Sequence, residues 1–341
     1  MLFRSAAAVP PAPRILRVYF IGNSLTMSTT LDRVHALCAL RGVDLQFGSQ
    51  ISGGKTLIRH LRYKDEPDQP WSSWETNVPA DGTFTPDPNH WQPQPLRFGR
   101  YDTALVNHRW DALVLQLHGP NLHDELLAVN GFVDFAQKHD SVKTYYLYSA
   151  WPFRPRPGSG APPRNIDYAA LWQAGYTASA ENKTRAAAAN VPSRSYVDRV
   201  FSGLRARHPA LSGALRLIPV GEVLLEIDRR LKNGELAAVA DLAKRTPAMV
   251  PSFGERASLA DGVNVLYADH IHFNPVPHKT PSLGIFISGT TIHTVLTGRN
   301  PVGLSAAPYA LDDPRDAALV EQIQRIIWSV VTADPRTGVN P

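Results

Sequence analysis

The sequence has a single cysteine among its 341 residues, so no disulfide can form within the chain. It has no run of about eighteen or more consecutive apolar residues, so no membrane-spanning helix is expected. Basic residues exceed acidic residues by only five and form no block, which argues against a nucleic-acid partner. With 43% hydrophobic and 19% charged residues, the composition is that of a folded chain.

The first residues of the sequence also lack the pattern of a secretory signal. The start, MLFRSAAAVPPAP, has no apolar segment of the kind found in secretory signals, so we expect a flexible segment over residues 1–14. The compartment stays open, including export if a leader has been trimmed. The lone cysteine, Cys38, stands at helical spacing from Leu31 and Val34, which predicts a small buried side chain rather than a nucleophile.

Strand-like and helix-like segments alternate along the chain, which favours an α/β fold with a mostly parallel sheet covered on both faces. The expected strands are 17–21, 43–51, 112–117, 142–148, 215–220 and 263–267. The expected helices are 31–41, 56–62, 125–138, 168–190, 194–207, 222–232, 283–296 and 317–332. No internal repeat or linker is visible, so we expect one domain over residues 15–341. Two segments rich in proline, near 63–100 and 151–166, read as insertions.

The stretch RVYFIGNSLT places a serine directly after a predicted strand. Gly22 allows a tight turn, so Ser24 would stand at the carboxyl edge of a parallel sheet, where α/β proteins bind ligands. Such a serine can act as a nucleophile. The alternative is that Ser24 or Thr26 only caps the next helix, and cap preferences taken alone favour that interpretation.

A nucleophilic serine needs a base and a group that orients the base. The stretch YADHIHFNPVPH supplies both, because Asp269 and His272 stand three residues apart after a predicted strand. On a tight turn the carboxylate could hold one imidazole nitrogen while the other faces Ser24. The alternative is a zinc site built from His270, His272 and His278. The presence of Ser24 favours the triad.

Ester hydrolysis also needs donors for the negative charge that develops on the carbonyl oxygen. After the second strand, the backbone N–H groups of Gly53 and Gly54 are candidates, although an ordinary glycine turn fits equally well. The third strand ends in VLQLHGPN, where Gln116 and Asn121 are candidate donors. Gln116 so late in an apolar strand would be costly unless paired or functional. His118 is expected to be an interior histidine, with substrate contact as the alternative.

Together these motifs resemble the SGNH hydrolases, also called GDSL-like esterases, and within them a bacterial subgroup with GNSLT in the first block. The match runs from Gly22-Asn23-Ser24-Leu25-Thr26 through Gly54 to the Asp-x-x-His of Asp269 and His272. Asn23 stands where the family usually has aspartate. The usual Gly-x-Asn-Asp block is absent, and the third oxyanion donor is therefore open between Gln116 and Asn121.

The resemblance implies a flavodoxin-like α/β/α fold and hydrolysis of an ester, often an acetyl group on a carbohydrate, without metal or other cofactor. It implies Ser24 as nucleophile, His272 as base and Asp269 as the group that holds the imidazole. The hole would comprise the N–H groups of Ser24 and Gly54 and a third amide.

The substrate is expected to be a small or carbohydrate ester. Asn23, Trp151 and His118 are the candidate contacts, and the tryptophans of the two insertions could stack on sugar rings, although tryptophan more often anchors insertions to a core. These tryptophans are Trp71, Trp74, Trp91 and Trp151. The alternatives are a carbohydrate-binding or scaffold protein with impaired chemistry, and an acyltransferase, which differs from an esterase only in its acceptor.

Overall fold

The computed structural model describes residues 13–65, 98–118, 121–154, 165–176, 192–255, 257–273 and 281–341. Its centre is a five-stranded sheet with the order β2-β1-β3-β4-β5, and every pair of neighbours is parallel. The strands are β1 (Arg14–Gly22), β2 (Val43–Ile51), β3 (Trp110–Leu117), β4 (Val142–Ser149) and β5 (Leu215–Ile218). This order reverses direction at β1, as in flavodoxin-like folds.

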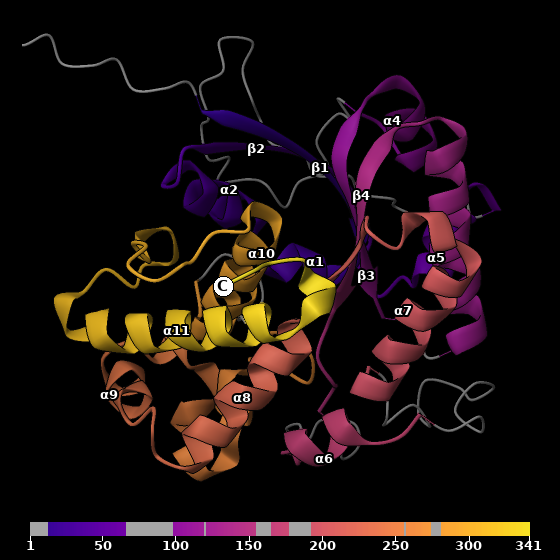
Figure 1. The fold of residues 1–341 in the computed structure, drawn as a ribbon. Coiled ribbons are helices and arrows are strands. Elements are labelled where there is room, and N and C mark those ends of the chain that lie inside the picture. Colours follow the sequence, from indigo (N-terminus) through magenta and orange to yellow (C-terminus); the bar gives the residue numbers. More distant parts are fainter. Residues whose placement is uncertain are drawn as a thin grey trace, which may run out of the picture.

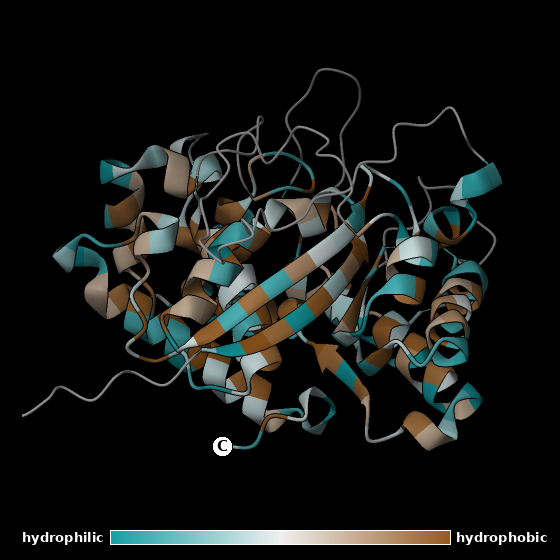
Figure 2. Cartoon of the chain, turned by 90° about the horizontal axis from the view of Figure 1, so that it is seen from above, coloured by the Kyte–Doolittle hydropathy of each residue, from teal (hydrophilic) through white to brown (hydrophobic). Residues whose placement is uncertain are grey.

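Helices cover both faces of the sheet, so the predicted three-layer α/β/α architecture is confirmed (Figures 1 and 2). One layer holds α2 (Leu31–Ala39), α8 (Val220–Lys232), α10 (Leu283–Thr297) and α11 (Ala317–Ala333). The other holds α3 (Leu57–Leu61), α4 (Tyr101–Asn107), α5 (Leu122–Lys138) and α7 (Arg194–Arg207). The shorter helices are α1 (Ser24–Ser28), α6 (Tyr168–Gln173) and α9 (Ala238–Arg245).

The central strands are buried on both faces. Leu113, Val114 and Leu115 of β3 are almost completely inaccessible, which accounts for the unbroken apolar run in the sequence. Cys38 is fully buried on α2, as predicted, and its Sγ lies 3.5 Å from Nδ1 of His293 on α10. Burial raises the pKa of this thiol to about 12, so it is not a nucleophile at neutral pH.

The predicted strand at 263–267 is wrong. This apolar run belongs to a 3-10 segment, η7 (Leu259–Leu266), which packs on α8 and has a kink at Gly262. The carboxylate of Asp228 on α8 accepts the N–H of Val263 at 2.9 Å. Asn264 donates to the backbone oxygen of Ile166 at 2.8 Å. The segment's polar groups are thus satisfied by side chains and loops, and it does not pair with β5.

Several boundaries also differ from the prediction. The first strand begins at Arg14, inside the segment expected to be flexible, while residues 1–12 lie outside the described part of the chain. Most of the two predicted insertions, 66–97 and 155–164, also lies outside it. The expected helix from residue 168 ends at Gln173. No helix in the described ranges combines the length and apolar character needed to cross a bilayer.

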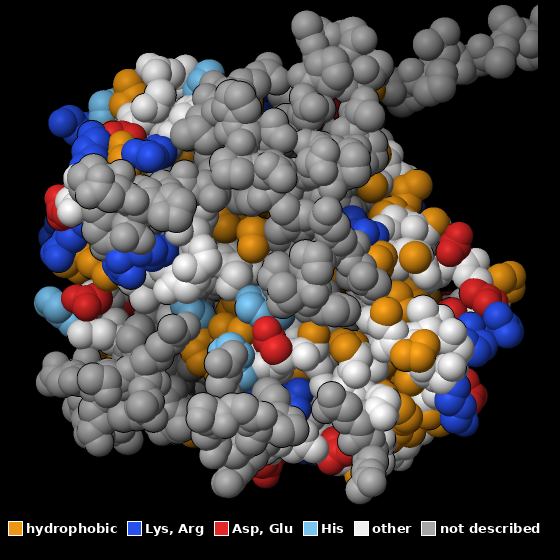
Figure 3. Space-filling view, turned by 180° about the vertical axis from the view of Figure 1, so that it is seen from behind, with side chains coloured by type: hydrophobic (Ala, Val, Ile, Leu, Met, Phe, Trp, Pro, Cys, Tyr) orange, Lys and Arg blue, Asp and Glu red, His pale blue; other side chains and the backbone are white. Residues whose placement is uncertain are grey.

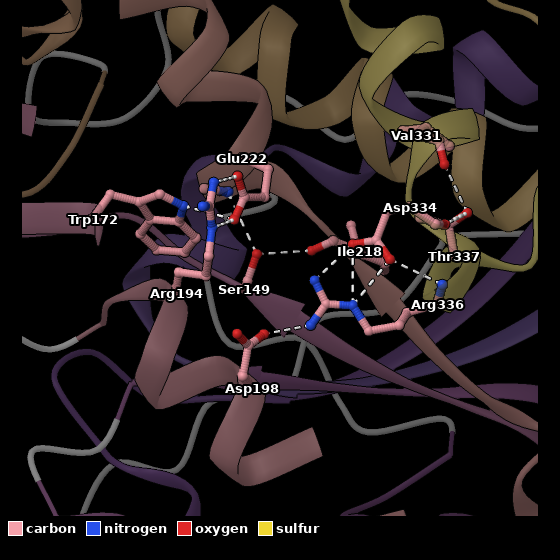
Figure 4. A network of polar contacts seen from close by, with 11 residues as sticks. Ser149, Trp172, Arg194, Asp198, Ile218, Glu222, Val331, Asp334, Arg336 and Thr337 are labelled. Carbon is pink, nitrogen blue, oxygen red and sulfur yellow. Dashed lines mark hydrogen bonds and ion pairs between the residues drawn. The ribbon is translucent and has the colours of Figure 1, made fainter. Parts of the chain in front are cut away.

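A polar network ties the carboxyl end of the sheet to the surrounding helices (Figure 4). Ser149 at the end of β4 donates to the backbone oxygen of Ile218 in β5 at 3.1 Å. Glu222 at the start of α8 accepts from Trp172 Nε1 at 2.9 Å and pairs with Arg194 of α7. These contacts fix α6, α7 and α8 against the last two strands.

Two buried histidines make the fold sensitive to acid. Burial lowers the pKa of His60 to about 3 and that of His293 to about 4, whereas both imidazoles protonate near pH 6.5 in the unfolded chain. Below pH 6.5 the unfolded chain therefore binds more protons. The free energy of unfolding should fall from about pH 6.5 to pH 4, by up to about 1.4 kcal/mol per pH unit for each histidine.

Urea unfolding at steps of pH measures this slope. His293→Gln should have a shallower slope than the unsubstituted protein, because it removes one of the two buried imidazoles. A stability that does not change between pH 6.5 and pH 4 would contradict the assignment.

Candidate active site

Ser24 lies at the first position of the short helix α1, immediately beyond β1. The helix is capped by Asn23, whose Oδ1 accepts the N–H of Leu25 at 3.0 Å. The capping role considered for Ser24 in the sequence is therefore taken by its neighbour. Ser24 is partly exposed, and within the described ranges neither its hydroxyl nor its N–H has a hydrogen-bond partner. Both groups are open to a ligand.

The topology places this turn in the crevice where ligands bind in such sheets. Ile21 of β1 pairs with Leu115 of β3, so Gly22 lies beside Gln116 at the carboxyl edge. Because the strand order reverses at β1, the connections from β1 and β3 diverge to opposite faces and leave a crevice between them. Ser24 stands at the β1 side of this crevice.

The second glycine motif lies against the same turn. Ser52, just beyond β2, donates its N–H to the oxygen of Gly22 at 3.2 Å, and Asn23 Nδ2 donates to the oxygen of Lys55 at 3.2 Å. Between these two contacts Gly54 is exposed with a φ of 68°. Its N–H has no acceptor among the described residues. The free N–H groups of Ser24 and Gly54 thus belong to two turns that are bonded to each other.

Asp269 and His272 form a hydrogen-bonded pair between η7 and α10. His272 Nδ1 lies 2.8 Å from Asp269 Oδ2, and Asp269 Oδ1 accepts the N–H groups of Ile271 and His272, each at 2.7 Å. Burial acts to raise the pKa of Asp269, but these hydrogen bonds outweigh it and hold the pKa below its ordinary value. An ionised Asp269 keeps the proton of His272 on Nδ1 and leaves Nε2 as the basic nitrogen.

Aromatic packing anchors this turn to the segment that leaves β4. The ring of Trp151 stacks on Phe273 with 4.1 Å between centroids, and its Nε1 donates to the oxygen of Ile271 at 2.7 Å. The N–H of Arg154 donates to the oxygen of His270 at 2.8 Å. The turn therefore lies by the carboxyl end of β4, which is separated from β1 only by β3, or about 10 Å at the usual strand spacing.

Two of the predicted substrate contacts are enclosed by the protein in this structure. Trp151 has no exposed surface, and its ring is packed on Phe273. Asn23 is also fully buried, and its amide is bonded to the protein through Leu25, Lys55 and Gln116.

The other candidates on the third-strand segment have partners within the protein. Gln116 is 1% exposed, and its amide is bonded to the Ser24 turn. His118 is buried with its ring 4.9 Å from that of Phe153, in keeping with the default expectation of an interior histidine. Asn121 caps α5, where its Oδ1 accepts the N–H of His123 at 2.9 Å. Its Nδ2 has no acceptor among the described residues.

The zinc alternative involves residues that the structure describes only in part. Within the described ranges no three His, Cys, Asp or Glu side chains are grouped so that they could hold a metal ion. Asp269 is bonded to His272, while His278, the third histidine of the predicted zinc set, lies outside those ranges, as do Trp71, Trp74 and Trp91.

A separate groove of about 1000 Å³ lies between α6, α8 and α11, and none of the predicted site residues lines it. Its charged groups are already paired, as in Lys232 with Asp228 at 2.8 Å and Arg336 with Asp334 at 2.7 Å.

Figure 3 shows the opposite side of the molecule, where basic side chains lie in small groups near acidic ones, and histidines and an acidic group border apolar atoms near the middle.

Comparison with known proteins gives a likeness of fold. No protein-family model and no curated protein matches the chain. A DUF4886 family protein from Bacteroides uniformis is similar in structure, with 14% identity, a TM-score of 0.56 and coverage of 94% of this chain and 96% of that one. A protein from Slackia heliotrinireducens described as a candidate SGNH hydrolase has 18% identity and a TM-score of 0.36, and covers 82% of this chain and 100% of its own. The similarity to the Bacteroides protein supports the fold alone. No conclusion is drawn from the similarity to the Slackia protein, whose TM-score is too low.

Glycine at position 22 is required by the close approach of the turn to β3. A Cβ added there would lie 2.2 Å from Thr26 Oγ1 and 2.7 Å from Gln116 Oε1, whereas a Cβ at Gly53 would meet no atom within 4 Å. Gly22→Ala should therefore lower the free energy of unfolding by about 1–3 kcal/mol. Gly53→Ala, the matched control, should change it by less than about 0.5 kcal/mol. Chemical denaturation measures both, and equal stabilities for the two variants would contradict this packing.

Proposed function

We propose that the chain is a serine ester hydrolase of the SGNH type that removes a short acyl group, with acetyl on a carbohydrate as the expected substrate. The observation that carries the proposal is the pairing of His272 Nδ1 with Asp269 on a turn two strands from Ser24. This pair is the base and orienting group that a serine nucleophile needs. The choice of acetyl and carbohydrate comes from the sequence resemblance.

In the proposed reaction the Ser24 hydroxyl attacks the acyl carbon while His272 Nε2 takes its proton. Asp269 holds the imidazole in the required tautomer and stabilises the imidazolium. The imidazolium then gives its proton to the leaving alcohol. A water molecule attacks the acyl group on Ser24, again with His272 as base, and the acid is released with Ser24 restored.

The negative charge of the tetrahedral intermediate would be bound by two backbone N–H groups and one side-chain amide. Those of Ser24 and Gly54 support this assignment because no described acceptor uses them and their turns are bonded to each other. For the third donor we assign Asn121, whose Nδ2 has no acceptor in the described ranges. Gln116 is not assigned, since its side chain is buried and its Nε2 already donates to Asn23 Oδ1.

Replacement of the nucleophile tests the proposal directly. Ser24→Ala should lower kcat for p-nitrophenyl acetate by at least about 1,000-fold and abolish labelling by a fluorophosphonate, which modifies activated serines. Ser28→Ala is the matched control, because Ser28 lies on the same helix and its buried hydroxyl has no hydrogen-bond partner among the described residues. Hydrolysis at equal rates by the unsubstituted protein and Ser24→Ala would overturn the assignment.

The orienting carboxylate gives a second test. Asp269→Asn should lower kcat by about 100-fold or more, because an amide at this position no longer enforces the tautomer with the proton on Nδ1. The melting temperature should change little, since the asparagine Oδ1 can still accept the N–H groups of Ile271 and His272. A folded Asp269→Asn variant with unchanged kcat would contradict the proposed role of Asp269.

A further inference from the structure

Gln116 is unusual because its buried amide interrupts an apolar run near the end of β3, and its hydrogen bonds go to one turn. Its Oε1 accepts the N–H of Asn23 at 3.0 Å, the N–H of Thr26 at 3.0 Å and the hydroxyl of Thr26 at 2.6 Å. Its Nε2 donates to Asn23 Oδ1 at 2.9 Å. These contacts bracket Ser24 from both sides in the sequence.

The contacts of Asn23 show why an amide occupies this position. Its Oδ1 accepts from two donors, the N–H of Leu25 and Nε2 of Gln116, which fixes the oxygen. Its Nδ2 faces the backbone oxygen of Lys55, which can only accept. An aspartate could accept the first two hydrogen bonds but could not donate the third, and it would bring a buried negative charge against a carbonyl oxygen.

The short helix needs this support. Helix α1 has only five residues, and a single helical turn is not stable without outside contacts. A shift of the turn by about 1 Å would move the Ser24 hydroxyl and N–H away from the reacting geometry. The groups that can prevent such a shift are buried, uncharged and hydrogen-bonded to the backbone on both sides of Ser24.

We propose that Gln116 is a positioning residue for Ser24, and that it acts with the Lys55 carbonyl to require asparagine rather than aspartate at position 23. The proposal rests on the proposed function only in taking Ser24 as the nucleophile. Gln116 touches no substrate in this assignment and acts by holding the turn through Asn23 and Thr26.

Substitutions that remove some or all of these hydrogen bonds test the proposal. In Gln116→Met the side chain keeps its size but loses the polar atoms, so kcat for p-nitrophenyl acetate should fall about 10- to 100-fold, with KM changed less than about threefold. Thr26→Val should lower kcat several-fold, whereas Thr26→Ser, which keeps the hydroxyl, should restore most of the activity. Asn23→Asp should lower kcat by about tenfold or more.

Tyr148→Phe is the matched control. Tyr148 pairs with Gln116 across the β3 and β4 register and is fully buried, but its hydroxyl has no hydrogen-bond partner in the part of the chain that the structure describes. Its removal should leave kcat, KM and the melting temperature close to those of the unsubstituted protein. The control separates loss of the Gln116 contacts from general disturbance of the buried strands.

Amide hydrogen exchange provides a readout that does not require catalysis. In Gln116→Met, peptides containing Asn23 and Thr26 should exchange at least about tenfold faster, because two N–H groups lose their acceptor, while peptides from α5 and α11 should be unchanged. A folded Gln116→Met variant with unchanged exchange in these peptides and kcat within twofold of the unsubstituted protein would overturn the positioning role. Full activity of Asn23→Asp would overturn the requirement for an amide.

The two proposals can fail separately. If the unsubstituted protein hydrolyses no ester and takes up no fluorophosphonate, the proposed function fails. The exchange experiment then still decides whether Gln116 holds the turn, since faster exchange supports this role and unchanged exchange overturns it.

Discussion

The candidate site depends on how the polar groups of one buried turn are satisfied. A strand that ends at Gly22 and continues into a five-residue helix leaves several backbone N–H groups without helical partners. Side-chain oxygens of Asn23 and Gln116 accept those of Asn23, Leu25 and Thr26. No described residue accepts the N–H of Ser24, so the hydrogen bonds that stabilise the turn leave this one donor available to a ligand.

The hydrogen-bonded pair of Asp269 and His272 is held by a different kind of interaction. The turn that carries Asp269 and His272 is anchored by the stacked rings of Trp151 and Phe273 and by hydrogen bonds to the segment beyond β4. Aromatic stacking fixes the turn as a unit, and the carboxylate then fixes the imidazole within it. The amides of Asn23 after β1 and Gln116 in β3 position the Ser24 turn, and aromatic packing beyond β4 positions the turn of Asp269 and His272.

The sequence predicted the layers of the fold because its strands and helices have clear periods and are each long enough to be distinguished. It failed at 263–267, since a short apolar run looks the same in a strand and in a 3-10 segment, and the deciding partner, Asp228, lies far away in the chain. Local motifs predicted Ser24, Asp269 and His272 as the candidate triad. They could not show that Trp151 and Asn23 are buried, because burial depends on distant neighbours, and the Lys55 carbonyl has no signature in the sequence.

The two residues at which the sequence departs from the SGNH pattern are in contact in the structure. Asn23 replaces the usual aspartate, and the third strand carries Gln116 in place of the usual third block, yet these two side chains are hydrogen-bonded to each other. A buried polar group without a partner costs about 1–3 kcal/mol. The hydrogen bond between Asn23 and Gln116 avoids this cost for both side chains and supports the Ser24 turn from two strands, which is the support that the proposed nucleophile needs.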